Sequence, residues 1–268
     1  MKGGFYLMTI NDSCRFIYAN QISDEFGVQL CSAIGNVSRS GNSEVRNIIS
    51  TQNSYNNRFN LHGVNYENPV SLDLIIYNID GSYIDPNKER SLKKWLMKDG
   101  YHWLQFDQDT LADIYYLCIA QKCEIIDVGT YSGGMLVSFL CDSYHAYSGL
   151  RKKSYTTVNG TLSFALNMIL DFDDYLVQPT LIVQATSDGT CTIKNNTTNE
   201  TLSIANCVSG ETITIDCSTD QIISSTNRLM IDSWNKSGIS LCEGINNLEL
   251  TGNFKLEMQY RLPIRVGA

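Results

Sequence analysis

One stretch of the chain, residues 85–107, carries a clear helix signal in a sequence whose other segments mostly suggest strands. Asp85 can accept hydrogen bonds from the first turn of a helix, and Pro86 suits the first helical position. The apolar side chains that follow recur at helical spacing, and Gly100 can end the helix. The residues after Gly100 alternate as a strand does. The pattern predicts a helix over 86–98, followed directly by a strand.

Short alternating segments dominate the rest of the first half. Gly133 and Gly134 are expected to form the turn before the last of these segments. Strands are expected at Phe5–Ile10, Cys14–Tyr18, Ser71–Ile79, Ile114–Ala120, Lys122–Val128 and Leu136–Cys141. With the helix, they predict an α+β domain in the first half of the chain.

Residues 35–60 have a different composition: they are rich in Ser and Asn and contain three arginines, Arg39, Arg46 and Arg58. A segment of this length is uncommon in a compact domain unless it has a function of its own. We expect an extended arm, 35–60, that holds one or two edge strands and contacts a neighbouring molecule.

The second half lacks any helix signal. Polarity rises over residues 148–155, where the basic run at 151–153 is expected to be a linker, so we place the boundary between domains 1–150 and 151–268. About eight short strands separated by turns are expected beyond it, one of them at 228–232. They predict an all-β sandwich, for which a jelly roll is one suitable arrangement. The expected fold class of the whole chain is mainly β.

Composition excludes several classes of protein. The net charge of −8 argues against general binding to a nucleic-acid backbone, and no apolar run is long enough to span a membrane. The first residues make a poor signal peptide, so folding in a cytoplasm is expected. The nine cysteines include no C-x-x-C pair, and there are only three histidines. We therefore expect reduced, mostly buried cysteines and no metal site.

No catalytic motif is present. The glycines lack the spacing of a phosphate-binding loop, and there is no G-x-S-x-G. The histidines lie at 62, 102 and 145, so the second domain has no histidine base. The chain is expected to be neither an enzyme nor a cofactor-binding protein.

Two features of the second half leave alternatives open. Asp171, Asp173 and Asp174 lie in one expected loop, where they could bind calcium, act as a glycosidase pair or simply be solvated. Trp234 could stack on a sugar or anchor a strand end. A carbohydrate-binding module that uses these four residues is the alternative function, and a hydrolase with unpaired carboxylates is a third.

Three segments in the middle of the first half resemble a known family. They are Arg90–Leu96 (RSLKKWL), Trp103–Asp107 (WLQFD) and Ile114–Cys118 (IYYLC). In this order they resemble the distal tail proteins of long-tailed, siphovirus-like bacteriophages, which show an R-x-L-x-x-W-L helix, a turn, a short strand and a y-x-c strand. The specific motif covers only residues 70–145, whereas the two-domain layout covers most of the chain.

The resemblance implies a structural hub in a phage tail tip or baseplate. Family members form hexameric rings through the N-terminal domain, and an extended arm serves as a belt between subunits, so Arg39, Arg46 and Arg58 become candidate ring contacts. The implied partners are the tail tube protein, a tail-tip or tail-associated protein and receptor-binding proteins. The implied location is the virion tail, after assembly in the cytoplasm of the host bacterium, with no nucleic-acid or membrane partner.

The resemblance also implies a galectin-like C-terminal domain. Sugar-binding galectins use a histidine together with Asn, Arg, Trp and Glu. The second domain has no histidine, so that sugar site cannot be present in its usual form.

Overall fold

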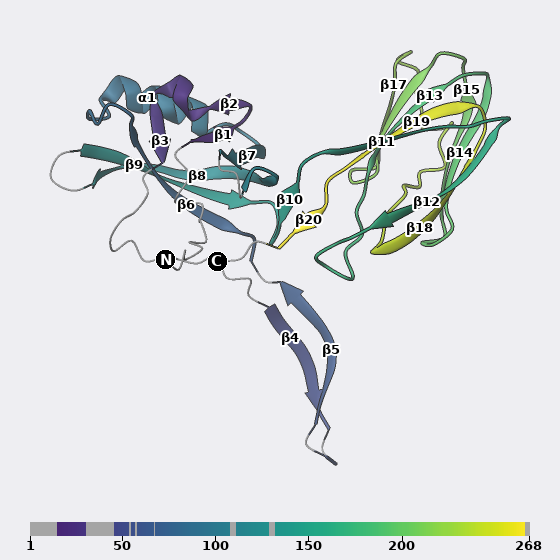
Figure 1. The fold of residues 1–268 in the computed structure, drawn as a ribbon, viewed down its shortest axis with the longest axis horizontal. Coiled ribbons are helices and arrows are strands. Elements are labelled where there is room, and N and C mark those ends of the chain that lie inside the picture. The colour runs from purple at the N-terminus through teal and green to yellow at the C-terminus, as the bar shows by residue number, and fades with distance from the viewer. Residues whose placement is uncertain are drawn as a thin grey trace, which may run out of the picture. The chain divides into compact units, whose positions relative to one another are not determined.

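The computed structural model describes residues 15–30, 46–53, 55–56, 58–66, 68–107, 111–128 and 132–265. The first expected strand, Phe5–Ile10, lies outside them. The described chain is mainly β with one α-helix, which confirms the predicted fold class (Figure 1). It divides into two compact units, with one change of unit between Tyr147 and Ser148 and a return to the first unit at Ile264. No helix among the described residues is long and apolar enough to cross a membrane.

The first unit is built on a nine-stranded sheet with the central order β2-β1-β7-β8-β9-β6-β3, while β10 pairs with β8 and β20. A separate two-stranded sheet contains β4 and β5. The elements are β1 (Phe16–Tyr18), β2 (Gln21–Ile22), a 3-10 helix (Ser23–Phe26), β3 (Val28–Leu30), β4 (Arg46–Gln52), β5 (Phe59–Tyr66), β6 (Ser71–Asn78), α1 (Pro86–Leu96), β7 (His102–Phe106), β8 (Ile114–Val128), β9 (Ser132–Cys141) and β10 (Ala146–Ser148).

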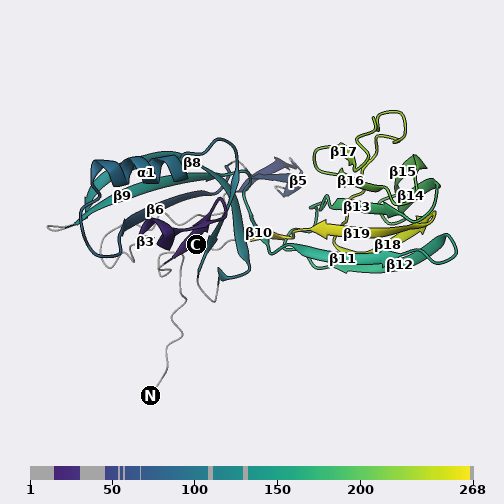
Figure 2. The same cartoon turned by 90° about the horizontal axis from the view of Figure 1, so that it is seen from above.

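Helix α1 begins as the sequence predicts, because Asp85 Oδ1 accepts a hydrogen bond of 2.8 Å from the Lys88 N–H. It ends at Leu96, two residues before the predicted end, because the backbone of Met97 leaves the helical conformation. Its apolar face is buried, and Figure 2 shows the helix lying along the sheet. Trp95 stacks on Phe26 at 4.1 Å between ring centroids. These contacts place the helix at the centre of the first core.

Two predictions about the longest hairpin are wrong. β8 is one strand rather than two, because a bulge at Gln121 lets it continue from Ala120 to Lys122. Gly133 and Gly134 pair with β8 inside β9 and do not form the turn. A Cβ on Gly133 would lie 3.0 Å from the Tyr83 ring, so this glycine serves a close approach inside a strand.

The described cysteines are free thiols, and most of them are buried as expected. Cys118 and Cys141 lie directly opposite each other on β8 and β9. A hydrogen bond with Cys141, together with burial, raises the pKa of the Cys118 thiol well above its usual value. Cys14 and Cys31 lie outside the described residues. The buried thiols therefore act as small apolar core residues.

The second unit is a sandwich of two antiparallel sheets, with orders β11-β19-β13-β16-β17 and β12-β18-β14-β15. Its core lies between the sheets and includes Leu181, Ile204 and Leu250, all fully buried. The strands are β11 (Arg151–Thr156), β12 (Thr161–Met168), β13 (Thr180–Ala185), β14 (Gly189–Asn195), β15 (Glu200–Cys207), β16 (Thr212–Asp216), β17 (Gln221–Ser224), β18 (Gly244–Thr251) and β19 (Phe254–Tyr260). The last strand of the chain, β20 (Pro263–Ile264), belongs to the nine-stranded sheet of the first unit.

Two local predictions in this unit are also wrong. The basic run at 151–153 begins β11, which pairs with β19, and is not a linker. Residues 228–232 form turns and irregular backbone instead of a strand, although the buried Met230 between the exposed Leu229 and Ile231 gives the alternation of a strand. Alternation of burial alone therefore does not identify a strand here.

Candidate functional site

The first candidate surface is the arm, defined here as the hairpin of residues 46–66 formed by β4 and β5. Among the residues that the structure describes, its strands pair only with each other. The tip is closed by a hydrogen bond of 2.7 Å from the Asn53 N–H to the Arg58 carbonyl oxygen, and Tyr55 between them is fully exposed. The predicted arm, 35–60, overlaps this hairpin, while its residues 35–45 lie outside the described part of the chain.

A bulge gives the arm one apolar face. Ile49 pairs with Gly63, but the next residue, Ser50, pairs with Leu61, so His62 is the extra residue. In a regular strand, Leu61 and Val64 would face opposite sides, because they lie three residues apart. The extra residue restores both to one face.

The apolar face of the arm is bare. It holds Ile48, Phe59, Leu61 and Val64, whose exposed fractions are 66%, 68%, 65% and 37%. The opposite face is mostly polar, and there Thr51 Oγ1 and His62 Nε2 lie 2.6 Å apart in a hydrogen bond. An amphipathic hairpin of this kind has an apolar face but no core of its own to cover it.

The candidate ring arginines are distributed along the arm. Arg39 lies outside the described residues. Arg46 is the first residue of β4 and pairs with Tyr66, at the base of the hairpin. Arg58 is exposed next to the tip. The structure therefore places Arg46 and Arg58 at opposite ends of the arm.

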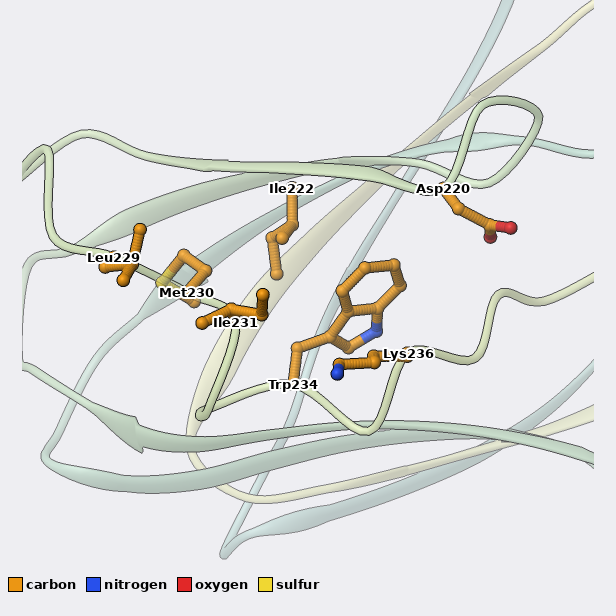
Figure 3. Close-up of a pocket in the computed structure, with 7 residues that line it drawn as sticks. All are labelled: Asp220, Ile222, Leu229, Met230, Ile231, Trp234 and Lys236. Atoms are coloured by element: carbon orange, nitrogen blue, oxygen red, sulfur yellow. The ribbon is translucent and has the colours of Figure 1, made fainter.

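The second candidate surface is a pocket of about 530 Å³ in the sandwich. Trp234 stands at its centre in Figure 3, with Ile222 opposite and Leu229 at one end. The full lining is Asp220, Ile222, Leu229, Met230, Ile231, Trp234 and Lys236. A volume in this range is typical of binding pockets, and five of these seven side chains are apolar or aromatic.

A buried ion pair fixes one wall of this pocket. Arg228 Nε donates to Glu211 Oε1 at 2.6 Å, and Arg228 Nη2 donates to Glu211 Oε2 at 3.2 Å. Ser224 Oγ also donates to Glu211, at 2.5 Å, while Arg228 Nη1 donates to Ser233 Oγ at 2.9 Å. The pair therefore joins the start of β16, and through Ser224 the end of β17, to the chain that carries Leu229 and the residues after it.

The charge state of Glu211 follows from these contacts. Burial of its side chain, which is 0% exposed, would raise the pKa of Glu211. The hydrogen bonds and charge of Arg228, with the bond from Ser224, outweigh burial and lower the pKa to about 2. Glu211 is therefore a permanent anion at neutral pH.

The acidic loop expected to hold a ligand lies elsewhere in the sandwich. Asp171, Asp173 and Asp174 are exposed between β12 and β13, around the buried Phe172. None of the three belongs to the lining of the pocket that contains Trp234. Within the described residues, no group of three or more metal-binding side chains could hold an ion. The structure therefore does not assemble the four predicted ligand residues in one pocket.

The apolar residues of both surfaces were missed from the sequence. The apolar face of the arm is concealed by the bulge, which breaks its alternation at His62. The sequence pattern predicts a strand over 228–232, which contains the pocket residues 229–231, although an exposed loop next to a tryptophan fits the same residues. The alternation of apolar residues becomes visible when one bulge residue is allowed for within the strand, and it then predicts the apolar face of the arm.

The chain matches two family models that together cover most of its length. Residues 11–143 match a phage tail protein N-terminal domain, and residues 145–260 match a phage tail C-terminal domain. No curated protein matches the chain significantly.

Solved structures share the fold at low sequence identity. The Dit protein of phage SPP1, described as a paradigm of the hub adsorption apparatus in phages that infect Gram-positive bacteria, matches with a TM-score of 0.65 and 12% identity over 92% of this chain and 98% of that one. A chain of the phage P2 baseplate in its calcium-activated conformation matches with a TM-score of 0.58 and 7% identity, over 93% and 97% of the two chains. The strontium-activated P2 baseplate gives a TM-score of 0.59 and 8% identity, over 92% and 97%.

These matches confirm the resemblance to distal tail proteins at the level of the fold, over nearly the whole length of both chains. The family models identify both halves of the chain independently. The chain belongs to the family of phage tail proteins that these two models describe.

Proposed function

We propose that the chain is the hub of a phage tail tip or baseplate and that identical subunits close into a ring, a hexamer, through the arm. The observation that carries this proposal is the bare apolar face of the arm, formed by Ile48, Phe59, Leu61 and Val64. A two-stranded hairpin is only marginally stable in water by itself. A neighbouring subunit that covers this face supplies the missing core.

The energy available from that contact is substantial. Burying a large aliphatic or aromatic side chain contributes about 1.5–3 kcal/mol. The arm offers four such side chains on one face, each at least one-third exposed before contact. A contact between different surfaces of identical subunits closes into a ring when the rotation between neighbours allows it. A ring of this kind would use the arm once at every subunit boundary.

The hub would join a tail tube protein to a tail-tip or tail-associated protein and would carry receptor-binding proteins. Its location would be the virion tail, following assembly in the cytoplasm of the host bacterium. This role needs neither catalysis nor a cofactor. The net charge of −8 suits a passage for DNA, because like charges repel and the DNA would not adhere.

The test compares two neighbouring residues on opposite faces of the arm. Leu61→Asp adds a charge to the apolar face, and Asn60→Asp adds the same charge to the polar face. We expect light scattering to show rings for the wild type and Asn60→Asp but single subunits for Leu61→Asp, with negative-stain images to match.

Either of two results would overturn the proposal. One is a wild-type chain that remains a single subunit at every concentration. The other is an intact ring in Leu61→Asp, which would place the subunit contact outside the apolar face of the arm.

A further inference from the structure

Strand β17 leaves hydrogen-bonding groups at an open edge. It is the last strand of the five-stranded sheet and, within the described part of the chain, pairs only with β16. The hydrogen bond from the Ser225 N–H to the Thr212 carbonyl oxygen shows which residue pairs of β16 and β17 are joined by backbone hydrogen bonds. Hydrogen-bonded and non-hydrogen-bonded pairs alternate along antiparallel strands, and Ile222 belongs to a non-hydrogen-bonded pair. Its N–H and C=O therefore point away from β16. Neither group has a partner among the described residues.

The pocket lies directly beside this open edge. The side chain of Ile222 lines it and faces Trp234, while Leu229 and Ile231 form the facing wall (Figure 3). A strand that paired with the edge would place one side chain opposite Ile222, on the same face of the sheet. That side chain would enter the pocket, and its neighbours along the added strand would lie beside the exposed Ile223.

We propose that the open edge of β17 and this pocket bind an extended segment of a second polypeptide by strand addition. The segment carries a large apolar side chain opposite Ile222 and basic residues at its flank. Backbone hydrogen bonds hold the segment, and the pocket selects its apolar side chain. The inference deepens the proposed hub function, on which it rests for the class of partner, another protein of the tail.

Charge around the pocket selects the basic flank. Asp220 lines the pocket, and Asp232 is exposed directly after Ile231. Lys236 is the basic residue of the lining, whereas Arg228 nearby is committed to Glu211. The aspartates thus outnumber the available cation, and a segment with lysine or arginine at its flank complements them.

The wall of the pocket is rigid, which favours a preformed binding surface. Leu229 and Ile231 are 82% and 54% exposed, yet Met230 between them is buried in the core. The ion pair of Arg228 holds one end of this wall. At the other end, Trp234 pairs with Ile204, and its indole N–H donates to the Ser237 carbonyl oxygen at 3.1 Å. Such preorganisation lowers the entropic cost of binding.

The same contacts disfavour a glycan as the ligand. Sugar hydroxyls need several hydrogen-bonding side chains, but the lining offers only Asp220 and Lys236. The indole N–H of Trp234 is already bonded inside the protein. An apolar side chain from an added strand makes better use of the five apolar and aromatic residues.

The test uses the full chain and a fluorescent synthetic peptide in which isoleucine alternates with threonine after a run of lysines. Binding is followed by fluorescence anisotropy. Leu229→Asp is expected to weaken binding by about tenfold or more, because the charge enters the apolar wall. The matched control is Val158→Asp, at a residue that is 67% exposed outside the pocket, and it is expected to leave binding within about twofold of the wild type.

Three peptide results would overturn the inference: no binding by the wild-type chain, equal binding by Leu229→Asp, or undiminished binding of a peptide whose central residue is proline, which cannot donate to the edge. A hit on a glycan array that Leu229→Asp abolishes would also overturn it, in favour of a sugar site. The proposed ring is judged separately, by light scattering of the same samples. Leu229→Asp is expected to lose the peptide and keep the ring, whereas Leu61→Asp is expected to lose the ring and keep the peptide.

Discussion

The arm and the 225–236 segment of the sandwich both expose large apolar side chains, but they are held in different ways. The arm is a hairpin whose strands, in the part of the chain that the structure describes, pair only with each other, and the side chains of its apolar face are all exposed. The 225–236 segment has almost no regular structure, yet the Glu211–Arg228 pair, Met230 and Trp234 fix it to the sandwich.

The two surfaces are therefore suited to different kinds of contact. A hairpin without a core gains its stability from whatever covers it, which suits a permanent contact between subunits. A loop fixed by buried groups keeps its shape when nothing is bound, which suits the reversible docking of a separate partner. Regular secondary structure and rigidity are therefore separate properties in this chain.

The largest expected effect is the loss of the buried ion pair. Glu211→Gln leaves Arg228 without its counter-ion and is expected to lower the free energy of unfolding by about 3–5 kcal/mol. Urea denaturation followed by circular dichroism measures this difference. The matched control is Glu89→Gln, which removes the partly exposed partner of Lys93 on helix α1 and should cost at most about 0.5 kcal/mol. Equal losses in the two variants would show that Glu211 does not fix the segment.

The same pair gives a pH signature. The pKa of Glu211 is about 2 in the folded chain, against an ordinary value of 4.5. Because the folded pKa is the lower one, the stabilisation is fully present above pH 4.5 and is lost as the pH falls toward 2.

That stabilisation is on the order of 3 kcal/mol, since each pKa unit corresponds to about 1.4 kcal/mol. We expect the difference in unfolding free energy between wild type and Glu211→Gln to shrink over this pH interval. A difference that stays constant down to pH 2 would contradict the assigned charge state.

The smallest effect is expected in the arm. In single subunits, obtained by dilution, Leu61→Ala should change the unfolding free energy by less than about 0.5 kcal/mol, because Leu61 is 65% exposed. Leu241→Ala in the sandwich, where the side chain is fully buried, should cost about 2–5 kcal/mol. A large loss for Leu61→Ala in single subunits would mean that the arm packs within its own chain.

The predictable parts of the fold are those that local chemistry controls. Asp85 and Pro86 marked the start of the only α-helix among the described residues, and the alternation from Phe254 onward marked β19. Gly133 was misassigned because its reason for being glycine is the distant ring of Tyr83, which no local pattern shows. The bulge at Gln121 was likewise invisible, since it depends on the register with β9.

The candidate site was less predictable for the same reason. Trp234 was recognised as a possible ligand contact, and it does line the pocket. Its neighbours Ile222 and Leu229 come together because the loop that directly follows β17 folds back beside this strand, which no alternation pattern shows. The partner of Arg228 lies 17 residues away, where sequence spacing carries no signal.

The most direct test of the central claim, a ring closed through the arm, is the native mass of the wild-type chain beside that of Leu61→Asp. We expect a species at six times the 30.1 kDa subunit mass for the wild type and a single subunit for Leu61→Asp. Single subunits for both chains, or the same ring for both, would contradict it.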